Sequence, residues 1–333
     1  MHGSNVPTFL DCLLGASYAL LVVTFFLSPN IRAAGVKFPT IAIIPDAWHS
    51  PIHYSALTTY LSQAGYRVVT QRLPGCNSQI PALQSSAVDA AYVRNNVLLP
   101  EINSGVEVVL VAHSYGGCPA AVAAKGLSVS ERREVNQQGG VVELIFICGY
   151  ITRASNSLKK SLPGGKLGSW VVNYENNQLG IRDAKEVFYN DLPQNAADLA
   201  IAQLKNQSSM TFNAPTGNPA WADERYKGRL SYLQTSLDNA FPFTEQKRMI
   251  SQSLVAWDTT TIKSGHSPCL SHPELVGEWI VSRIEQNQAL PTKGDGPAST
   301  KHVSHVAMQN LDVTLAADHK YTSVAPMKGF VHY

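Results

Sequence analysis

A sharp change of pattern at Val108–Cys118 constrains the fold more than any other feature of this chain. The segment, Val-Val-Leu-Val-Ala-His-Ser-Tyr-Gly-Gly-Cys, begins as an aliphatic, β-branched run and passes a serine before two glycines. An alanine-rich stretch, Pro119–Lys125, follows and is typical of a helix. We therefore predict a strand, a tight turn and a helix, with Ser114 at the apex of the turn. Such a turn holds the serine in a strained backbone conformation and exposes its hydroxyl to a neighbouring base.

Strand-like and helix-like runs alternate on both sides of this turn. The predicted strands are Thr40–Ile44, Arg67–Gln71, Val106–Val111, Val141–Cys148, Leu230–Gln234 and Leu254–Thr261, and the main predicted helices are Tyr54–Ala64, Ser85–Ile102 and Pro273–Gln286. Strands separated by helices indicate βαβ units and a mainly parallel sheet. The unbroken apolar character of the strands favours helices on both faces of that sheet. The expected class is therefore α/β.

The alternation stops between Ile151 and Lys227, where the pattern becomes irregular. This stretch contains a possible hairpin at Trp170–Ile181, turning on Asn176-Asn177, and a helix at Asn195–Lys205. A structureless loop of this length is unusual in a compact domain, so we interpret residues 151–227 as a cap inserted over the carboxyl edge of the sheet. Residues 38–150 and 228–287 would then form the two parts of the core.

The two ends of the chain differ from this core. Leu13–Leu27 is almost wholly apolar, has no Lys or Arg before it, and is followed by Arg32 and Lys37. Residues 1–35 are thus interpreted as a membrane anchor, with the remainder on the cytoplasmic side, or as a secretory signal; a buried helix is a third possibility. We favour the anchor. Residues 288–333 show no clear period, which predicts a flexible C-terminal extension.

Composition narrows the class of ligand. A formal net charge of +2 and the absence of a Lys/Arg-rich run argue against nucleic acid as a partner. The cysteines form no Cys-x-x-Cys pair, so we expect neither a metal site nor another cofactor. Cys118 and Cys148 lie in apolar elements and are expected to be buried thiols. The sequence does not determine the oligomeric state.

A serine hydroxyl is a weak nucleophile at neutral pH and needs a base, which a third group orients. His266 follows the last predicted strand, and Asp238 directly follows the strand Leu230–Gln234. Both positions place the side chains at the carboxyl edge, beside Ser114. Asp258, inside a strand-like run, and Asp191, in the cap, are the rival acids. We expect His113 and His272 to have structural roles.

The intermediate of such a reaction needs two hydrogen-bond donors for its oxyanion. One candidate is the backbone N–H of Tyr115, directly after the nucleophile. The second lies in the loop after the first strand, where we favour the N–H of Ala47 and Trp48 is the alternative. The side chains of Trp48 and His49 are predicted to flank the substrate pocket.

Four segments together resemble a known family: Pro45-Asp46-Ala47-Trp48-His49, Ala112–Gly117, Leu237-Asp238 and Gly265-His266-Ser267-Pro268. They are similar to the α/β-hydrolase superfamily, and within it to the branch of plant methyl esterases, hydroxynitrile lyases and fungal hydrolases. Phe188–Pro193 also resembles the fungal members. The resemblance, from about Phe38 to Glu285, implies an eight-stranded, mostly parallel sheet with a helical cap, and it supports Ser114, Asp238 and His266 as the triad.

Two positions depart from the family pattern. Asp46 stands where the family often has Gly, and Ala112 replaces the usual first glycine. The expected function is a serine hydrolase acting on a small or medium apolar ester or lactone, and the fungal resemblance implies a substrate from specialised metabolism. A lyase or cyclase that uses the same residues for proton transfer is the alternative, although hydroxynitrile lyases carry a Lys where this chain has Ser267. A non-catalytic binding protein is a third reading, but such proteins typically lose a triad member.

Overall fold

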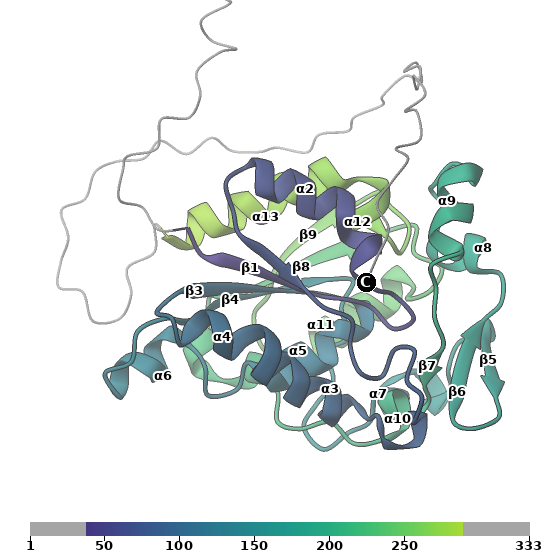
Figure 1. Ribbon diagram of the computed structural model, residues 1–333, viewed down its shortest axis with the longest axis horizontal. Coiled ribbons are helices and arrows are strands. Elements are labelled where there is room, and N and C mark those ends of the chain that lie inside the picture. The colour runs from purple at the N-terminus through teal and green to yellow at the C-terminus, as the bar shows by residue number, and fades with distance from the viewer. Residues whose placement is uncertain (1–37, 289–333) are drawn as a thin grey trace, which may run out of the picture. The chain divides into compact units, whose positions relative to one another are not determined.

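The computed structural model describes residues 38–288, and its centre is a six-stranded sheet in which every strand pairing is parallel (Figure 1). The strand order is β2-β1-β3-β4-β8-β9. The bounds are Thr40–Ile44 for β1, Val68–Thr70 for β2, Glu107–His113 for β3, Gly140–Ile147 for β4, Leu230–Thr235 for β8 and Asp258–Ile262 for β9. The predicted α/β class with a parallel sheet is confirmed.

The predicted number of eight strands is wrong for the described residues. Six strand-like runs were visible in the sequence, and the number eight came from the family resemblance alone. The predicted strand Leu254–Thr261 begins too early. Leu254 adopts a left-handed conformation that ends helix α11 (Phe243–Ser253), so strand β9 begins at Asp258. The side chain of Leu254 is 84% exposed, which explains why an apolar residue there does not extend the strand.

Alternation along the strands separates two hydrophobic layers. Ile41 and Ile43 of β1 face one side of the sheet, whereas Ala42 and Ile44 face the other. Helices α2 (Ser55–Gln63) and α13 (Pro273–Gln288) cover the first side, and Figure 1 shows them together along that face. The second side is covered by α3 (Ser86–Tyr92), α5 (Gly117–Ala123) and α11 (Phe243–Ser253), with α4 (Leu99–Ile102) and α6 (Val129–Glu134) nearby.

The segment between β4 and β8 forms its own small structures beside the sheet (Figure 1). Strands β5 (Val171–Tyr174) and β6 (Gln178–Ile181) form the predicted antiparallel hairpin, and β7 (Gln207–Ser208) joins them. Residues 175–177 connect the two strands, and Asn176 and Asn177 both have positive φ, a conformation that asparagine tolerates better than most residues. Short helices complete the segment: α7 (Leu158–Ser161), α8 (Ala184–Phe188), α9 (Gln194–Ile201) and α10 (Met210–Asn213).

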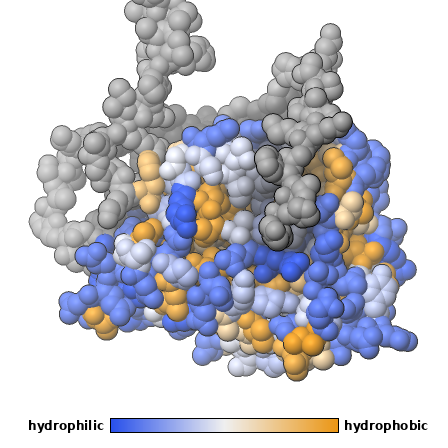
Figure 2. All heavy atoms as spheres, in the orientation of Figure 1, coloured by the Kyte–Doolittle hydropathy of each residue, from blue (hydrophilic) through white to orange (hydrophobic). Residues whose placement is uncertain are grey.

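The surface of the described part carries no broad apolar area on the face shown in Figure 2, where apolar side chains occur in small groups between polar ones. Among residues 38–288 no helix is long and apolar enough to cross a membrane. The predicted anchor or signal at Leu13–Leu27 and the extension at 288–333 lie outside the described residues.

Candidate active site

Ser114 stands at the turn between β3 and α5, with a φ of 49°, which is unusual for a residue other than glycine. Strain of this kind persists only where the surroundings enforce it. Here the close packing of the turn does so. A Cβ atom on Gly116 would lie 2.5 Å from the carbonyl oxygen of Ile44, and one on Gly117 would lie 2.8 Å from that of Tyr150. The two glycines therefore let the turn press against the loops that follow β1 and β4.

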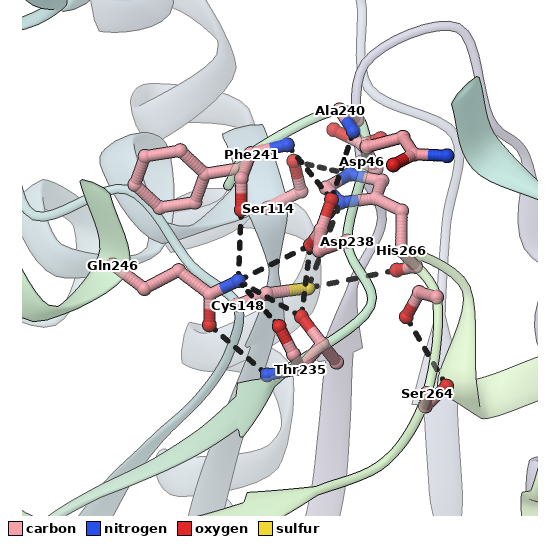
Figure 3. Close-up of polar contacts among 12 residues, drawn as sticks. Asp46, Ser114, Cys148, Thr235, Asp238, Ala240, Phe241, Gln246, Ser264 and His266 are labelled. Atoms are coloured by element: carbon pink, nitrogen blue, oxygen red, sulfur yellow. Dashed lines mark hydrogen bonds and ion pairs between the residues drawn. The ribbon is translucent and has the colours of Figure 1, made fainter. Parts of the chain in front are cut away.

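The structure brings the three predicted catalytic side chains together (Figure 3). Nε2 of His266 lies 2.9 Å from Oγ of Ser114, and Nδ1 of His266 lies 2.8 Å from Oδ2 of Asp238. Each residue follows a different strand of the parallel sheet, β3, β8 and β9, so their common edge explains the convergence. All three are at least 94% buried.

A dense set of donors holds the carboxylate of Asp238. The backbone N–H groups of Ala240 and Phe241 donate to its Oδ1 at 2.9 and 2.7 Å, and the hydroxyl of Thr235 donates to its Oδ2 at 2.8 Å. Gln246 from α11 adds a further bond to Oδ2 at 3.3 Å. These hydrogen bonds fix the position of the carboxylate, as an orienting acid requires. The rival Asp258 is exposed on β9 and pairs with Arg283.

His266 is flanked by two carboxylates rather than one. Besides Asp238 at Nδ1, Oδ2 of Asp46 lies 3.3 Å from Nε2. Burial alone would lower the pKa of His266, but the negative charge of Asp238 and the hydrogen bonds to Asp238 and Asp46 raise that pKa well above its ordinary value. The imidazole is thus strongly stabilised in its protonated form.

The two amides predicted to form the oxyanion hole point at the same atom. The N–H groups of Ala47 and Tyr115 donate to Oδ1 of Asp46 at 2.7 and 3.1 Å. The N–H of Trp48, the alternative donor, instead donates to Oε1 of Gln207 at 3.1 Å. Burial would raise the pKa of Asp46, but the hydrogen bond and charge of His266 lower it well below its usual range.

A mainly apolar cavity of about 280 Å³ opens beside Ser114. Trp48 lines it, together with side chains of the inserted segment, of α11 and of the loop before α11, among them Trp170, Phe188, Phe212 and Phe241. His49 does not line this cavity, and its substrate-binding role stays a prediction. Trp48 has a φ of 63°, and the chain then directs His49 beneath the loop, where its ring bonds to the carbonyl of Ala47 and the hydroxyl of Tyr189.

His113 links two loops of the site, in keeping with the structural role expected for it. The hydroxyl of Tyr54 accepts from the N–H of Asp46 and lies 2.8 Å from Nδ1 of His113. Nε2 of His113 donates to the carbonyl of His266 at 2.7 Å. Burial lowers the pKa of His113 to about 4, so the ring is neutral near pH 7. It fixes the backbone of the base without adding charge.

Sequence reasoning missed the function of Asp191, which it weighed only as a rival acid. Its Oδ2 accepts from the hydroxyls of Ser264 and Ser271 and from the N–H of Gly265, at 2.8 to 2.9 Å. The neighbouring Asn190 donates to the carbonyl of Leu237 at 2.8 Å. The inserted segment thus clamps both the His266 loop and the Asp238 loop. The only signal in the sequence was the family-like motif Phe188–Pro193.

Among the described residues, His113, Cys148 and His266 are close enough to share a metal ion. They do not fit that role, because both nitrogens of each imidazole already have hydrogen-bond partners. Burial also raises the pKa of the Cys148 thiol to about 11, which disfavours the thiolate that a metal requires. All four cysteines of the described part are buried free thiols.

Comparisons with known proteins concern the family and the fold. The model of the alpha/beta hydrolase family matches residues 41–279. The alpha/beta hydrolase nvfD of Aspergillus novofumigatus is 32% identical over 246 residues, covering 73% of this chain and 95% of that protein. Among solved structures, a pyrethroid hydrolase from Sphingobium faniae matches with a TM-score of 0.57 at 19% identity, over 74% of this chain and 97% of the other. The methylesterase MES16 from Arabidopsis matches with a TM-score of 0.56 at 15% identity, over 75% and 100%. The chain therefore belongs to the alpha/beta hydrolase family.

Proposed function

We propose that the protein is a serine hydrolase that cleaves a small or medium apolar ester or lactone. The observation that carries the proposal is the hydrogen-bonded series from Ser114 through His266 to Asp238, at 2.9 and 2.8 Å, beside an apolar cavity. Nucleophile, base and orienting acid in this arrangement define acyl transfer to a serine. Structural neighbours named as hydrolases and esterases support the same reaction class.

In the proposed mechanism Oγ of Ser114 attacks the substrate carbonyl while Nε2 of His266 takes the hydroxyl proton. The resulting imidazolium gives that proton to the leaving alcohol, and an acyl ester remains on Ser114. His266 then removes a proton from water, which attacks the acyl ester, and gives that proton to Oγ of Ser114 as the acid is released. Asp238 stabilises the imidazolium in both halves of the reaction. The N–H groups of Ala47 and Tyr115, which donate to Oδ1 of Asp46 in this structure, would turn to the oxyanion during the reaction.

The cavity supports the proposed substrate class. Aromatic side chains form much of its wall, and its volume of about 280 Å³ is at the small end for ligand pockets. Lys166 and Glu245 are the charged side chains on the wall away from the triad. An uncharged acyl or alkoxy group fits this lining, since burial of a charge without a partner would be unfavourable. We also propose that the ester or lactone substrate comes from specialised metabolism.

Covalent labelling tests the nucleophile. The purified protein is incubated with a fluorophosphonate probe, and the labelled peptide is identified by mass spectrometry. We expect the label on Ser114, its loss in Ser114→Ala, and its retention in the control Ser62→Ala, which changes an exposed serine of α2. Hydrolysis of p-nitrophenyl esters should disappear in parallel. Labelling of another residue, or unchanged turnover in Ser114→Ala, would show that the serine mechanism is wrong.

A proton-transfer reaction, as in a lyase or cyclase, is the second candidate. The observation that favours it is the position of His266 between the carboxylates of Asp238 and Asp46. The carboxylate of Asp46 also accepts from both amides proposed as oxyanion donors. Turnover in water enriched in oxygen-18 separates the two reactions. Hydrolysis places the heavy oxygen in the acid product, whereas elimination or cyclisation leaves the product unlabelled.

A further inference from the structure

The oxyanion hole of this protein is already filled by one of its own side chains. Oδ1 of Asp46 lies 2.7 Å from the N–H nitrogen of Ala47 and 3.1 Å from that of Tyr115. These are the separations at which such donors hold the oxygen of a reacting carbonyl. Oδ1 therefore occupies the position that the substrate oxygen needs.

The carboxylate is held firmly in this position. Asp46 is only 2% exposed, and its backbone N–H donates to the hydroxyl of Tyr54 at 2.8 Å. Its second oxygen, Oδ2, is buried and lies 3.3 Å from Nε2 of His266, with which it forms an ion pair when the ring is protonated (Figure 3). The carboxylate also borders the cavity beside Ser114, so it has space on that side into which it can rotate.

This arrangement opposes acyl transfer in two ways. The carbonyl oxygen of an ester cannot reach either amide while Oδ1 is bound to both of them. The negative charge of the carboxylate also repels the negative charge that develops on that oxygen. A further effect concerns the base: an anionic oxygen at 3.3 Å favours a proton on Nε2 of His266, and a protonated Nε2 cannot accept the proton of Ser114.

We propose that Asp46 is a specificity-determining residue that keeps the oxyanion hole closed to simple esters, so that only a substrate able to displace its carboxylate is attacked. The proposal rests on the serine hydrolase function proposed above and adds to it. It makes the chain a poor general esterase, because a short ester has too few contacts in the cavity to compensate for moving a bound carboxylate out of the hole.

Substitution of Asp46 tests the proposal in the full-length protein. Asp46→Ala removes the carboxylate and leaves both amides free to bind a substrate oxygen. Asp46→Asn keeps the size and an acceptor oxygen at the hole but removes the charge. Asp198→Ala, which changes an exposed aspartate of α9, is the matched control. The readouts are kcat/KM for p-nitrophenyl acetate and the second-order rate constant for fluorophosphonate labelling of Ser114.

We expect Asp46→Ala to raise both rates at least about tenfold, since a single oxyanion donor typically contributes roughly 100- to 1,000-fold. Asp46→Asn should raise them less, because its amide still fills the hole, and Asp198→Ala should not change them. Equal or lower rates in a folded Asp46→Ala protein, with labelling still on Ser114, would overturn the proposal and make Asp46 a contributor to the reaction.

Two further results keep the outcomes distinct. If neither the wild type nor Asp46→Ala is labelled at Ser114, the serine hydrolase function itself is wrong and the role of Asp46 falls with it. If circular dichroism shows that Asp46→Ala is unfolded, Asp46→Gly gives the same comparison with the residue often found at this position in the family. Failure of a folded Asp46→Gly to exceed the wild-type rates would then overturn the proposal.

Discussion

At the scale of single residues, the site depends on buried carboxylates whose surroundings differ. Asp238 receives several hydrogen bonds beside the base, whereas Asp46 is placed between two backbone amides and His266. A third one, Asp89, is fully buried on α3 and accepts from the N–H of Gly75 and the hydroxyl of Tyr115, at 2.7 and 2.6 Å. The N–H of Tyr115 is one of the two donors proposed for the oxyanion, so we expect Asp89 to position this residue through its hydroxyl.

Asp89 should make the stability of the protein depend on pH. Burial raises its pKa from 3.8 to about 6, although the hydrogen bonds of Tyr115 and Gly75 act in the opposite direction. A pKa higher in the folded than in the unfolded state means that stability is lost as pH rises between these two values. The shift of about two units corresponds to a free energy on the order of 3 kcal/mol.

We therefore expect Asp89→Asn to become more stable relative to the wild type between pH 4 and pH 6, and the difference to remain constant above pH 6. Urea unfolding at several pH values measures this free energy. Asp198→Asn, on the exposed face of α9, is the control that should show no such trend. A difference between Asp89→Asn and the wild type that does not change from pH 4 to pH 7 would contradict the prediction.

At the scale of elements, the inserted segment does more than cover the cavity. Its Asp191 accepts three hydrogen bonds from the loop and short helix around His266, and a Cβ atom on Gly265 would collide with Oδ1 of Asn190. Glycine at position 265 therefore suits the close approach of these two segments. The base is positioned from one side by β9 and from the other by this segment.

Asp191→Ala should consequently weaken both the fold and the reaction. Hydrogen bonds to a charged group contribute about 1.5–3 kcal/mol each, and partial replacement by water reduces the loss, so we expect destabilisation on the order of 2–4 kcal/mol. The rate kcat should fall more than KM changes, because His266 loses orientation while the cavity wall is kept. Ser271→Ala removes one of the three bonds and should have a smaller effect on both quantities. Thermal unfolding and steady-state kinetics measure them, and an unchanged kcat in Asp191→Ala would show that the clamp does not position the base.

The sequence predicted some of these elements well and others not. The turn at Ser114 and the hairpin at Asn176-Asn177 have local causes, a strained apex between small residues and two residues that tolerate positive φ, so both were visible. The bonds of Asp191 and the burial of His49 depend on packing between segments far apart in the chain. Asp46 is the clearest example of a feature that the sequence predicts only in part. The sequence shows that Asp46 departs from the family pattern, but it does not show that the side chain points at the two amides.

At the scale of the whole molecule, the described residues 38–288 hold the six strands of the sheet and the side chains of the candidate site. The strand order predicts which residues meet, because β3, β4, β8 and β9 are adjacent and end at one edge. The alternating pattern was enough to predict this parallel arrangement. It was not enough to predict the number of strands, for which the family resemblance suggested two more than the described part contains.

The last prediction compares the core, residues 38–288, with the full-length chain. Residues 38–288 should fold alone and keep fluorophosphonate labelling of Ser114 within about twofold of the full chain, because they contain two hydrophobic layers and the triad residues. The full chain should sediment with membranes and resist carbonate extraction, since Leu13–Leu27 is apolar and the positive charges of Arg32 and Lys37 follow it. Edman sequencing of the full-length product distinguishes a retained anchor from a signal cleaved near Ala33. Full-length protein that is found intact in the soluble fraction would contradict the anchor, and loss of labelling in the shortened chain would show that the ends contribute to the site.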